Sequence, residues 1–431
     1  MHLSPFVVET ELTWYKHMKR VTKTTLAGCL VGTLSLTGCV GDSADSSDTT
    51  GSGGDFDFVG MLANYADNII IPNYQTTAAN AQQLAASNGP LMQYCNAIGS
   101  GDEASAFSAA STAWQDLQSA IQISESHVIG PAANNTNLLR NSLNSYHAGP
   151  LSTCGIDQSV VLASQDSSFD VSARTVTQRG IGAVEYLLFN NNLDHTCPSQ
   201  ITETSDWNSR PAQERKQLRC EYALTLSQDI SNTAESIADA WDINGDDYRS
   251  QFIHPNQVAD NFSALSDALF FMDVEVKDNK LGTPIGISNA CTDFACPSLA
   301  ESPYSQRSLQ NIQANVEGFS QMLTGGSGLG FDDIIAQAGL DSLNSDFNNN
   351  ITDALNTITT ASESLTQQAS AITDQNADTA CSNAAANPVV SATLSACHLY
   401  GFVKRITDDL KVGFVSAVNV DLPERAQSDA D

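Results

Sequence analysis

Apolar residues recur at steps of three and four over long stretches of the chain, which keeps them on one face of an α-helix. Alternating apolar and polar runs bounded by Asn-Gly or Gly-Gly hairpin signals are nearly absent. We therefore predict an all-α protein in which the apolar stripes form the cores of helical bundles. The stripes occupy residues 107–128, 218–241, 258–276, 309–319 and 394–410.

The chain has 431 residues, which is long enough to build two hydrophobic cores. The stretch 190–213 is irregular in pattern and carries a cysteine, so it is the natural boundary between them. We predict two four-helix-bundle-like domains packed side by side. The N-terminal bundle would cover residues 56–205, and the C-terminal bundle would cover 206–431 and end in a disordered tail.

Residues 18–39 have the pattern of an export signal, in which a basic start leads into an apolar stretch that ends in LTGC. The apolar run is shorter than the about 20 residues of a membrane-spanning helix. The ending resembles the lipobox of bacterial lipoproteins, which implies that Cys39 carries the lipid. We expect translation to start at Met18 and residues 1–38 to be absent from the mature protein.

Residues 39–55 are small, polar and acidic after the cysteine, so we expect a flexible tether between the lipid and the folded part. Val40, rather than an aspartate, follows the cysteine. The lipobox resemblance then implies anchoring at the periplasmic face of the outer membrane of a Gram-negative bacterium. The tether would hold the domain away from the membrane surface.

Cysteine usage agrees with export to an oxidising compartment, because eight cysteines remain once Cys29 is removed with the signal and Cys39 carries lipid. A thiolate metal site is the alternative, but the sequence has no CxxC pair. We expect disulfides between neighbours in sequence, namely Cys291–Cys296, Cys381–Cys397 and Cys197–Cys220, which leaves Cys95 with Cys154.

The charge balance is strongly acidic, with 19 Lys and Arg against 49 Asp and Glu and a formal net charge of −30. Such a surface repels the phosphates of nucleic acids and of anionic lipids. We therefore exclude nucleic acid as a partner. The acids are scattered along the chain, so the balance by itself indicates no metal site.

Five stretches, in this order, resemble the imelysin-like family of bacterial periplasmic proteins, also called M75 peptidases. The resemblance spans most of residues 56–415. The stretches are NYADNIIIPNY (64–74), AWQDLQSAIQISESHVIGP (113–131), RGIGAVEYLLF (179–189), KDNKLGTPIG (277–286) and ESPYSQRSLQNIQANVEGF (301–319).

The resemblance implies an exported or lipid-anchored all-α protein of two bundles that takes part in metal acquisition, with iron as the first metal to consider. The family signature is GxHxxE, whose His and Glu are the proposed metal ligands. Gly180 and Glu185 match the signature, but Gly182 stands where the histidine is expected. The peptidase activity is less well supported, because the sequence contains neither HExxH nor GxSxG.

Glu185 is the leading candidate for a ligand-binding or metal-binding residue. It shares a helical face with Ile181 and Leu188, so we expect it to point inward. A buried carboxylate is costly unless it is paired or hydrogen-bonded. The structural alternative to a ligand site is therefore an ion pair that holds the two domains together, formed with Arg179, Arg174 or a residue of the other bundle.

The remaining candidates lie in two other matched segments. Glu125 and His127 close the tryptophan-containing segment, and with Glu185 they would supply a three-ligand metal site. Glu301 precedes Ser302 and Pro303, which we expect to start a helix as N-cap and first residue. Glu301 would then lie beside a positive helix end, with Arg307 reaching back toward the acids.

Three functions remain open. The first is a lipoprotein that binds a metal ion or small ligand between two bundles, as an accessory to metal uptake. The second is a metallopeptidase of the M75 type, although no catalytic residue is identified. The third is a non-catalytic structural or protein-interaction lipoprotein in which Glu185 only stabilises the fold.

Overall fold

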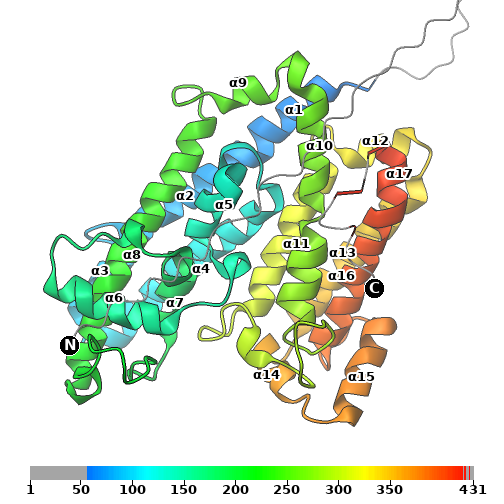
Figure 1. The fold of residues 1–431 in the computed structure, drawn as a ribbon. Helices are drawn as coiled ribbons and strands as arrows, with labels where there is room; N and C mark the ends of the chain where they lie inside the picture. The colour runs from blue at the N-terminus through cyan, green and yellow to red at the C-terminus, as the bar shows by residue number, and fades with distance from the viewer. Residues whose placement is uncertain (1–55, 421, 424–426, 428–431) are drawn as a thin grey trace, which may run out of the picture. The chain divides into compact units, whose positions relative to one another are not determined.

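The computed structural model describes residues 56–420, 422, 423 and 427, and within these residues all regular secondary structure is helical (Figure 1). The predicted all-α class is confirmed. Residues 55–431 belong to one compact unit. The proposed signal, the lipidation site at Cys39 and the tether lie outside the described residues. No helix of the described part is long and apolar enough to cross a membrane.

In the first part of the chain, helix α2 packs against both α4 and α8. α3 packs against α4 and α8, and α6 and α7 also pack against α8. These elements are α1 (Phe58–Tyr65), α2 (Ile71–Ala85), α3 (Pro90–Ala97), α4 (Glu103–Ser124), α5 (Asn134–Leu143), α6 (Thr153–Gln165), α7 (Gly180–Phe189) and α8 (Ala212–Trp241).

Among the later helices, α16 contacts α13, α15 and the π-helical segment Met272–Gly282. α11 packs against α13 within this group. The elements are α9 (Tyr248–Phe252), α10 (Val258–Leu269), α11 (Ser308–Thr324), α12 (Phe331–Gln337), α13 (Asp341–Thr360), α14 (Leu365–Ser370), α15 (Gln375–Ala386), α16 (Ser395–Asp409) and α17 (Val415–Val418).

The expected boundary near residue 205 coincides with an irregular stretch between α7 and α8. The helix that follows this stretch, α8, nevertheless packs against α2, α3, α5, α6 and α7, all of which precede it. The division into two domains stays a prediction, and these contacts put α8 with the helices of the first half.

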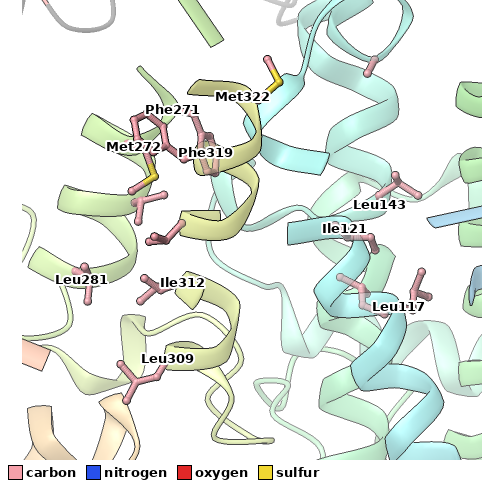
Figure 2. Packing of buried hydrophobic residues seen from close by; sticks show 14 of the residues in the cluster. Leu117, Ile121, Leu143, Phe271, Met272, Leu281, Leu309, Ile312, Phe319 and Met322 are labelled. Atoms are coloured by element: carbon pink, nitrogen blue, oxygen red, sulfur yellow. The ribbon is translucent and has the colours of Figure 1, made fainter. Parts of the chain in front are cut away.

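α4 and α11 are in contact, and this contact joins the two groups of helices. Several apolar side chains of the two helices point away from this contact. In Figure 2, Ile312 and Phe319 of α11 lie toward Met272 and Leu281, whereas the side chains of α4 lie with Leu143 on the other side. All of these residues are buried. Where α4 approaches α11, the side-chain amide of Asn315 donates to the backbone oxygen of Gln122 at 2.8 Å, so this contact includes polar side chains.

Four disulfides join the eight cysteines of the described part. The predicted pairs Cys291–Cys296 and Cys381–Cys397 are confirmed. The other two predicted pairs are wrong, because Cys95 bonds to Cys220 and Cys154 bonds to Cys197. Packing of α3 against α8 brings together two cysteines that are 125 residues apart, which proximity in sequence cannot indicate.

Candidate functional site

Glu185 lies in the middle of α7, a short helix that begins at Gly180. Gly180 has a φ of +77°, and a Cβ at this position would approach the backbone oxygens of Leu143 and Ser142 to 2.8 and 2.9 Å. Only glycine therefore fits this helix start without strain. The predicted inward orientation of Glu185 is confirmed, because its exposed fraction is 2%.

The loop before α11 supplies the hydrogen-bond donors for Glu185. Its Oε1 accepts from the backbone N–H groups of Tyr304 and Ser305, at 3.0 and 2.7 Å, and from the Ser305 hydroxyl at 2.8 Å. Burial raises the pKa of Glu185 to about 7, against the opposing effect of these donors, and the charge of Glu301 raises it further. Glu185 therefore exchanges its proton near neutral pH.

A cavity of about 540 Å³ adjoins this carboxylate. Glu185 and Gly182 of α7 form part of its wall, together with Gln118 of α4, Tyr304 and Glu301. A Cβ placed on Gly182 would meet only one atom within 4 Å, the Cδ1 of Leu151 at 3.8 Å. The position of the missing signature histidine thus faces open space beside Glu185.

Two further groups on the cavity wall have hydrogen-bonding capacity that no described residue uses. Nδ1 of His147 and Oε1 of Gln118 are buried without a hydrogen-bond partner. The His147 side chain is 4% exposed, and its Nε2 lies 3.5 Å from Oε1 of Glu125. Buried polar atoms are normally satisfied, so these atoms indicate that the cavity holds water or a ligand.

A buried ion cluster occupies the polar contact between α4 and α11. We call it the Lys280 cluster. The Lys280 ammonium lies 2.7 Å from Glu125 Oε2 and 3.1 Å from Glu301 Oε2, and it also donates to Gln122 and, at 2.9 Å, to Asn315. The side-chain amide of Asn144 donates to both carboxylates, at 2.9 and 2.8 Å. Oxygen atoms of four side chains therefore surround the ammonium.

The pKa of Glu125 shifts in the opposite direction from the pKa of Glu185. Burial alone would raise the pKa of Glu125, but the Lys280 ammonium and the His147 imidazole together hold it well below its usual range. Glu125 is therefore ionised at every physiological pH. The structure brings Glu125 and Glu301 together around one lysine, and Glu301 also lines the cavity of Glu185.

The expectation for residues 301–307 is wrong in its local structure. α11 begins at Ser308, and Ser302 has a φ of +52° in the turn that precedes it, so Ser302 is not the N-cap. Glu301 is 5% exposed and pairs with Lys280 instead of flanking a helix end. Arg307 donates at 3.1 Å to Oε1 of Gln115 on α4 and is not part of the cavity wall.

Arg179 and His127 also lie away from the cavity. Arg179 does not pair with Glu185, because it forms a two-pronged ion pair with Asp229 of α8 at 2.9 Å. His127 packs its ring against Tyr74, and its Nε2 lies 3.1 Å from the Asn73 amide. Burial lowers the pKa of His127 to about 4, so the ring is neutral at physiological pH.

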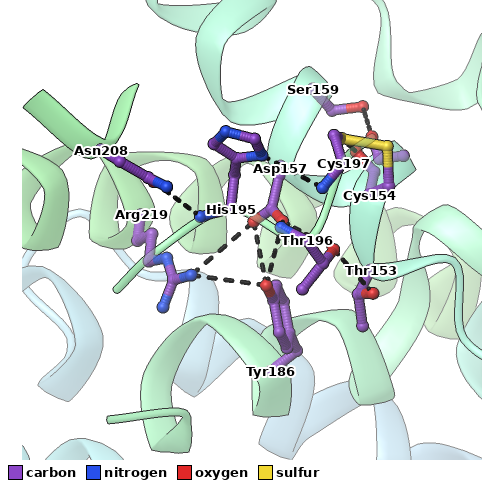
Figure 3. Close-up of a disulfide and its surroundings, with 11 residues drawn as sticks. Thr153, Cys154, Asp157, Ser159, Tyr186, His195, Thr196, Cys197, Asn208 and Arg219 are labelled. Carbon is purple, nitrogen blue, oxygen red and sulfur yellow. Dashed lines mark hydrogen bonds and ion pairs between the residues drawn. A yellow bond between two sulfur atoms is a disulfide. The ribbon is translucent and has the colours of Figure 1, made fainter. Parts of the chain in front are cut away.

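The opposite side of α7 is fixed by Tyr186, the residue after Glu185 (Figure 3). Its hydroxyl donates to the carboxylate of Asp157 at 3.0 Å, and Arg219 of α8 lies 3.7 Å from the same carboxylate. The Cys154–Cys197 disulfide holds the neighbouring segment, from which the Thr196 N–H donates to Asp157 at 2.8 Å. This network positions α7 and thereby the Glu185 carboxylate.

The described residues offer few ligands for a resident metal. Within residues 56–420 no group of three or more His, Cys, Asp or Glu side chains is arranged to hold a metal ion. Glu185 and His147 offer one carboxylate and one imidazole on the same cavity wall. The described residues therefore do not fit a metal held by protein side chains alone.

One family model matches most of this chain. The family model described as Imelysin (Peptidase M75) matches residues 70–394. A crystal structure of an imelysin-like protein from Psychrobacter arcticum 273-4 is similar in fold, with a TM-score of 0.58 and 16% identity over 85% of this chain and 96% of that one.

An iron-regulated protein A precursor from Parabacteroides distasonis ATCC 8503 gives a TM-score of 0.54 and 16% identity over 82% and 95% of the two chains. At this identity the two solved structures support the fold alone. A comparison with curated proteins gives no match.

Proposed function

Because the chain belongs to the imelysin family, we propose that it is an exported binding protein that takes a metal ion as cargo into the cavity beside Glu185. The observation that carries the proposal is a set of polar groups on the wall of one cavity. A carboxylate with a pKa of about 7, an imidazole whose Nδ1 has no hydrogen-bond partner and an unpartnered amide oxygen all border it.

The cargo would be a metal ion that keeps water molecules or a small chelator among its ligands. Small-ligand pockets have volumes of roughly 300–1,000 Å³, and the cavity of about 540 Å³ falls in this range. A bare ion would need more protein ligands than the described residues bring together. Iron is the first metal to test, because a protein of similar fold carries the name iron-regulated protein A precursor.

The pKa of Glu185 gives this proposal a pH dependence. A carboxyl group binds a cation in its ionised form, so a metal must displace the proton that Glu185 holds below about pH 7. Affinity should fall as the pH drops from 8 to 6.

We place the protein at the periplasmic face of the outer membrane, anchored by a lipid on Cys39. The LTGC ending and the acidic tether support this location. In cell fractionation, the unchanged chain should partition with membranes and the Cys39→Ser variant should not. A variant that remains with the membrane fraction would contradict the anchor.

The test of the cavity is a titration of the exported protein, purified without a metal-binding tag, with Fe(III), Fe(II), Cu(II) and Zn(II), with and without citrate. Metal content and calorimetry are measured for the unchanged chain and for Glu185→Gln, with Glu203→Gln as an exposed matched control. We expect binding of one ion per chain, reduced at least tenfold by Glu185→Gln and unaffected by the control.

Gly182→His sharpens this test, because it restores the signature histidine at a position with room for a side chain. If the unchanged chain binds metal, the variant should bind it more tightly. If only Gly182→His binds metal, the natural chain has lost the activity and the proposal is wrong. Absence of binding in both proteins would also overturn it and favour the interaction-protein alternative.

A further inference from the structure

The wall of the cavity beside Glu185 carries acidic groups without a permanent positive charge. Glu185 and Glu301 are among its lining residues, and none of these described residues is a lysine or an arginine. The basic side chain of the wall is His147. Arg140 and Glu275 have opposite charges and border a separate cavity. The charge of this wall therefore depends on its two glutamates and on His147.

The basic groups of this region already face carboxylates of their own. The Lys280 ammonium does not line the cavity, and it lies 3.1 Å from Oε2 of Glu301 and 2.7 Å from Oε2 of Glu125. Nε2 of His147 lies 3.5 Å from Oε1 of Glu125. Three carboxylates, those of Glu125, Glu185 and Glu301, thus share at most two cations. Once Glu185 is ionised, the region has a net negative charge whether or not His147 is protonated.

Two polar side chains of the wall present acceptors that no described residue uses. All three donors to Glu185 reach Oε1, and its Oε2 has no hydrogen-bond partner among the described residues. Oε1 of Gln118 also lacks a partner, and this residue is only 1% exposed. Carboxylate and amide oxygens accept hydrogen bonds and attract cations, whereas they repel the oxygens of an anion.

Apolar residues make up another part of the same wall. They include Leu151, Leu299, Ala300 and Pro303. Apolar side chains pack favourably against the carbon skeleton of an organic molecule, but they cannot replace the hydrogen bonds of the water around a hydrated ion. The cavity therefore combines a surface suited to a cation with a surface suited to an organic ligand.

We propose that the metal cargo enters this cavity inside a positively charged complex with an uncharged organic chelator, and that anionic complexes with carboxylate chelators are rejected. The inference rests on the proposed function and specifies the form in which the metal binds. Oε2 of Glu185 faces the positive charge of the complex, and the apolar residues contact the chelator. A cleft lined by charges of one sign concentrates ions of the opposite sign, which favours such a complex over an anionic one.

The test is equilibrium dialysis of the exported protein at pH 8 with three one-to-one Cu(II) complexes. The probes are the dication with bipyridine, the uncharged complex with iminodiacetate and the monoanion with nitrilotriacetate. Copper and chelator are both measured, which distinguishes retention of the whole complex from transfer of the ion. We expect affinity to fall in the order given, at least tenfold from the dication to the monoanion.

Glu185→Gln should weaken binding of the dication at least tenfold, because it removes the uncompensated charge from the wall. Exposed side chains such as His254 bind copper equally in both proteins, so the difference between the two reports the cavity. Glu203→Gln removes an exposed carboxylate elsewhere and should retain the preference for the dication. A preference that is unchanged in Glu185→Gln would contradict the inference.

Ser298→Lys adds a positive charge at an exposed position of the cavity lining, and it also serves if Glu185→Gln fails to fold. Ser108→Lys adds the same charge at an exposed position of α4 that does not line the cavity. The first variant should shift the ratio of affinities toward the monoanion at least tenfold, and the second should leave the ratio unchanged.

The outcomes separate this inference from the proposed function. Equal affinity for the three complexes, or copper retained without its bipyridine, would overturn the inference and leave the metal cargo in place. If the protein retains no copper in any form, including the free ion, and no other metal of the earlier titration, both proposals are wrong.

Discussion

Glu125 and Glu185 are equally buried carboxylates in neighbouring parts of the molecule, each with an exposed fraction of 2%, and their pKa values move in opposite directions. Glu125 has an ammonium group at 2.7 Å, whereas Glu185 has three neutral donors and no cation. Hydrogen bonds satisfy the Glu185 oxygen, but they do not compensate for the loss of solvent around its charge.

The difference separates a carboxylate that has a cation beside it from one that has only neutral donors. Glu125 has the Lys280 ammonium as its counter-charge. Glu185 lies on a cavity wall, and its pKa of about 7 places its proton exchange near neutral pH. Carboxylates of the second kind are candidates for functional sites, and our proposal for the cavity rests on this property.

The largest expected effect comes from removing the cation of the Lys280 cluster. Lys280→Met leaves the carboxylates of Glu125 and Glu301 buried without a counter-charge. We expect a loss of about 3–5 kcal/mol in the free energy of unfolding at pH 7, measured by urea denaturation. Adding Glu125→Gln to Lys280→Met should restore part of this loss, and a double variant no more stable than the single one would contradict the pairing.

The second effect concerns Glu185 and depends on pH. Its pKa is raised from 4.5 to about 7 on folding, so the folded state holds the proton more tightly than the unfolded state. The stability associated with that proton is fully present below about pH 4.5 and is lost as the pH rises through 7. The total loss is about 3 kcal/mol.

Glu185→Gln removes this dependence, because glutamine does not titrate. Urea denaturation of both proteins at pH 4.5 and pH 8 isolates the contribution of Glu185, since the other acids are common to the two. The unfolding free energy of the variant relative to the unchanged chain should increase by about 3 kcal/mol between these pH values. If the unfolding free energies of the two proteins changed with pH in parallel, the charge of Glu185 would have to be compensated in the folded state, as that of Glu125 is.

The smallest effect comes from one donor. Ser305→Ala removes the hydroxyl that donates to Glu185 at 2.8 Å and keeps the two backbone donors. Because the ionised form loses a hydrogen bond, the pKa of Glu185 should rise further, and stability at pH 8 should fall by about 1 kcal/mol. Carbon NMR titration of the glutamate carboxyl groups measures the pKa of Glu185 in both proteins. An unchanged pKa would exclude the Ser305 hydroxyl as a donor.

The sequence was sufficient for the helices and for the orientation of Glu185. The periodic stripes at 107–128 and 218–241 correspond closely to α4 and α8, because the faces of long helices are visible in the spacing of apolar residues. The inward position of Glu185 followed from its apolar neighbours on the same face. Both predictions depend on residues within one helix.

The contacts between elements could not be predicted in this way. Spacing places Arg179 near Glu185 in the chain, but the packing of α7 on α8 gives it Asp229 as a partner. His147 has no motif around it and reaches the cavity from a single helical turn, Tyr146–Ala148. Lys280 lies in a segment that resembles the family, yet only folding brings it between Glu125 and Glu301.

The bond between Cys95 and Cys220 has a consequence for the resistance of the protein to proteolysis. The irregular, largely exposed residues 190–206 lie inside the loop that this bond closes, and such segments are where proteases cut first. A chain cut there is not released as two pieces, because the bond ties α3 to α8 across the break. A nicked molecule keeps its full mass until its disulfides are reduced, and it retains both halves of the cavity wall on one covalent framework.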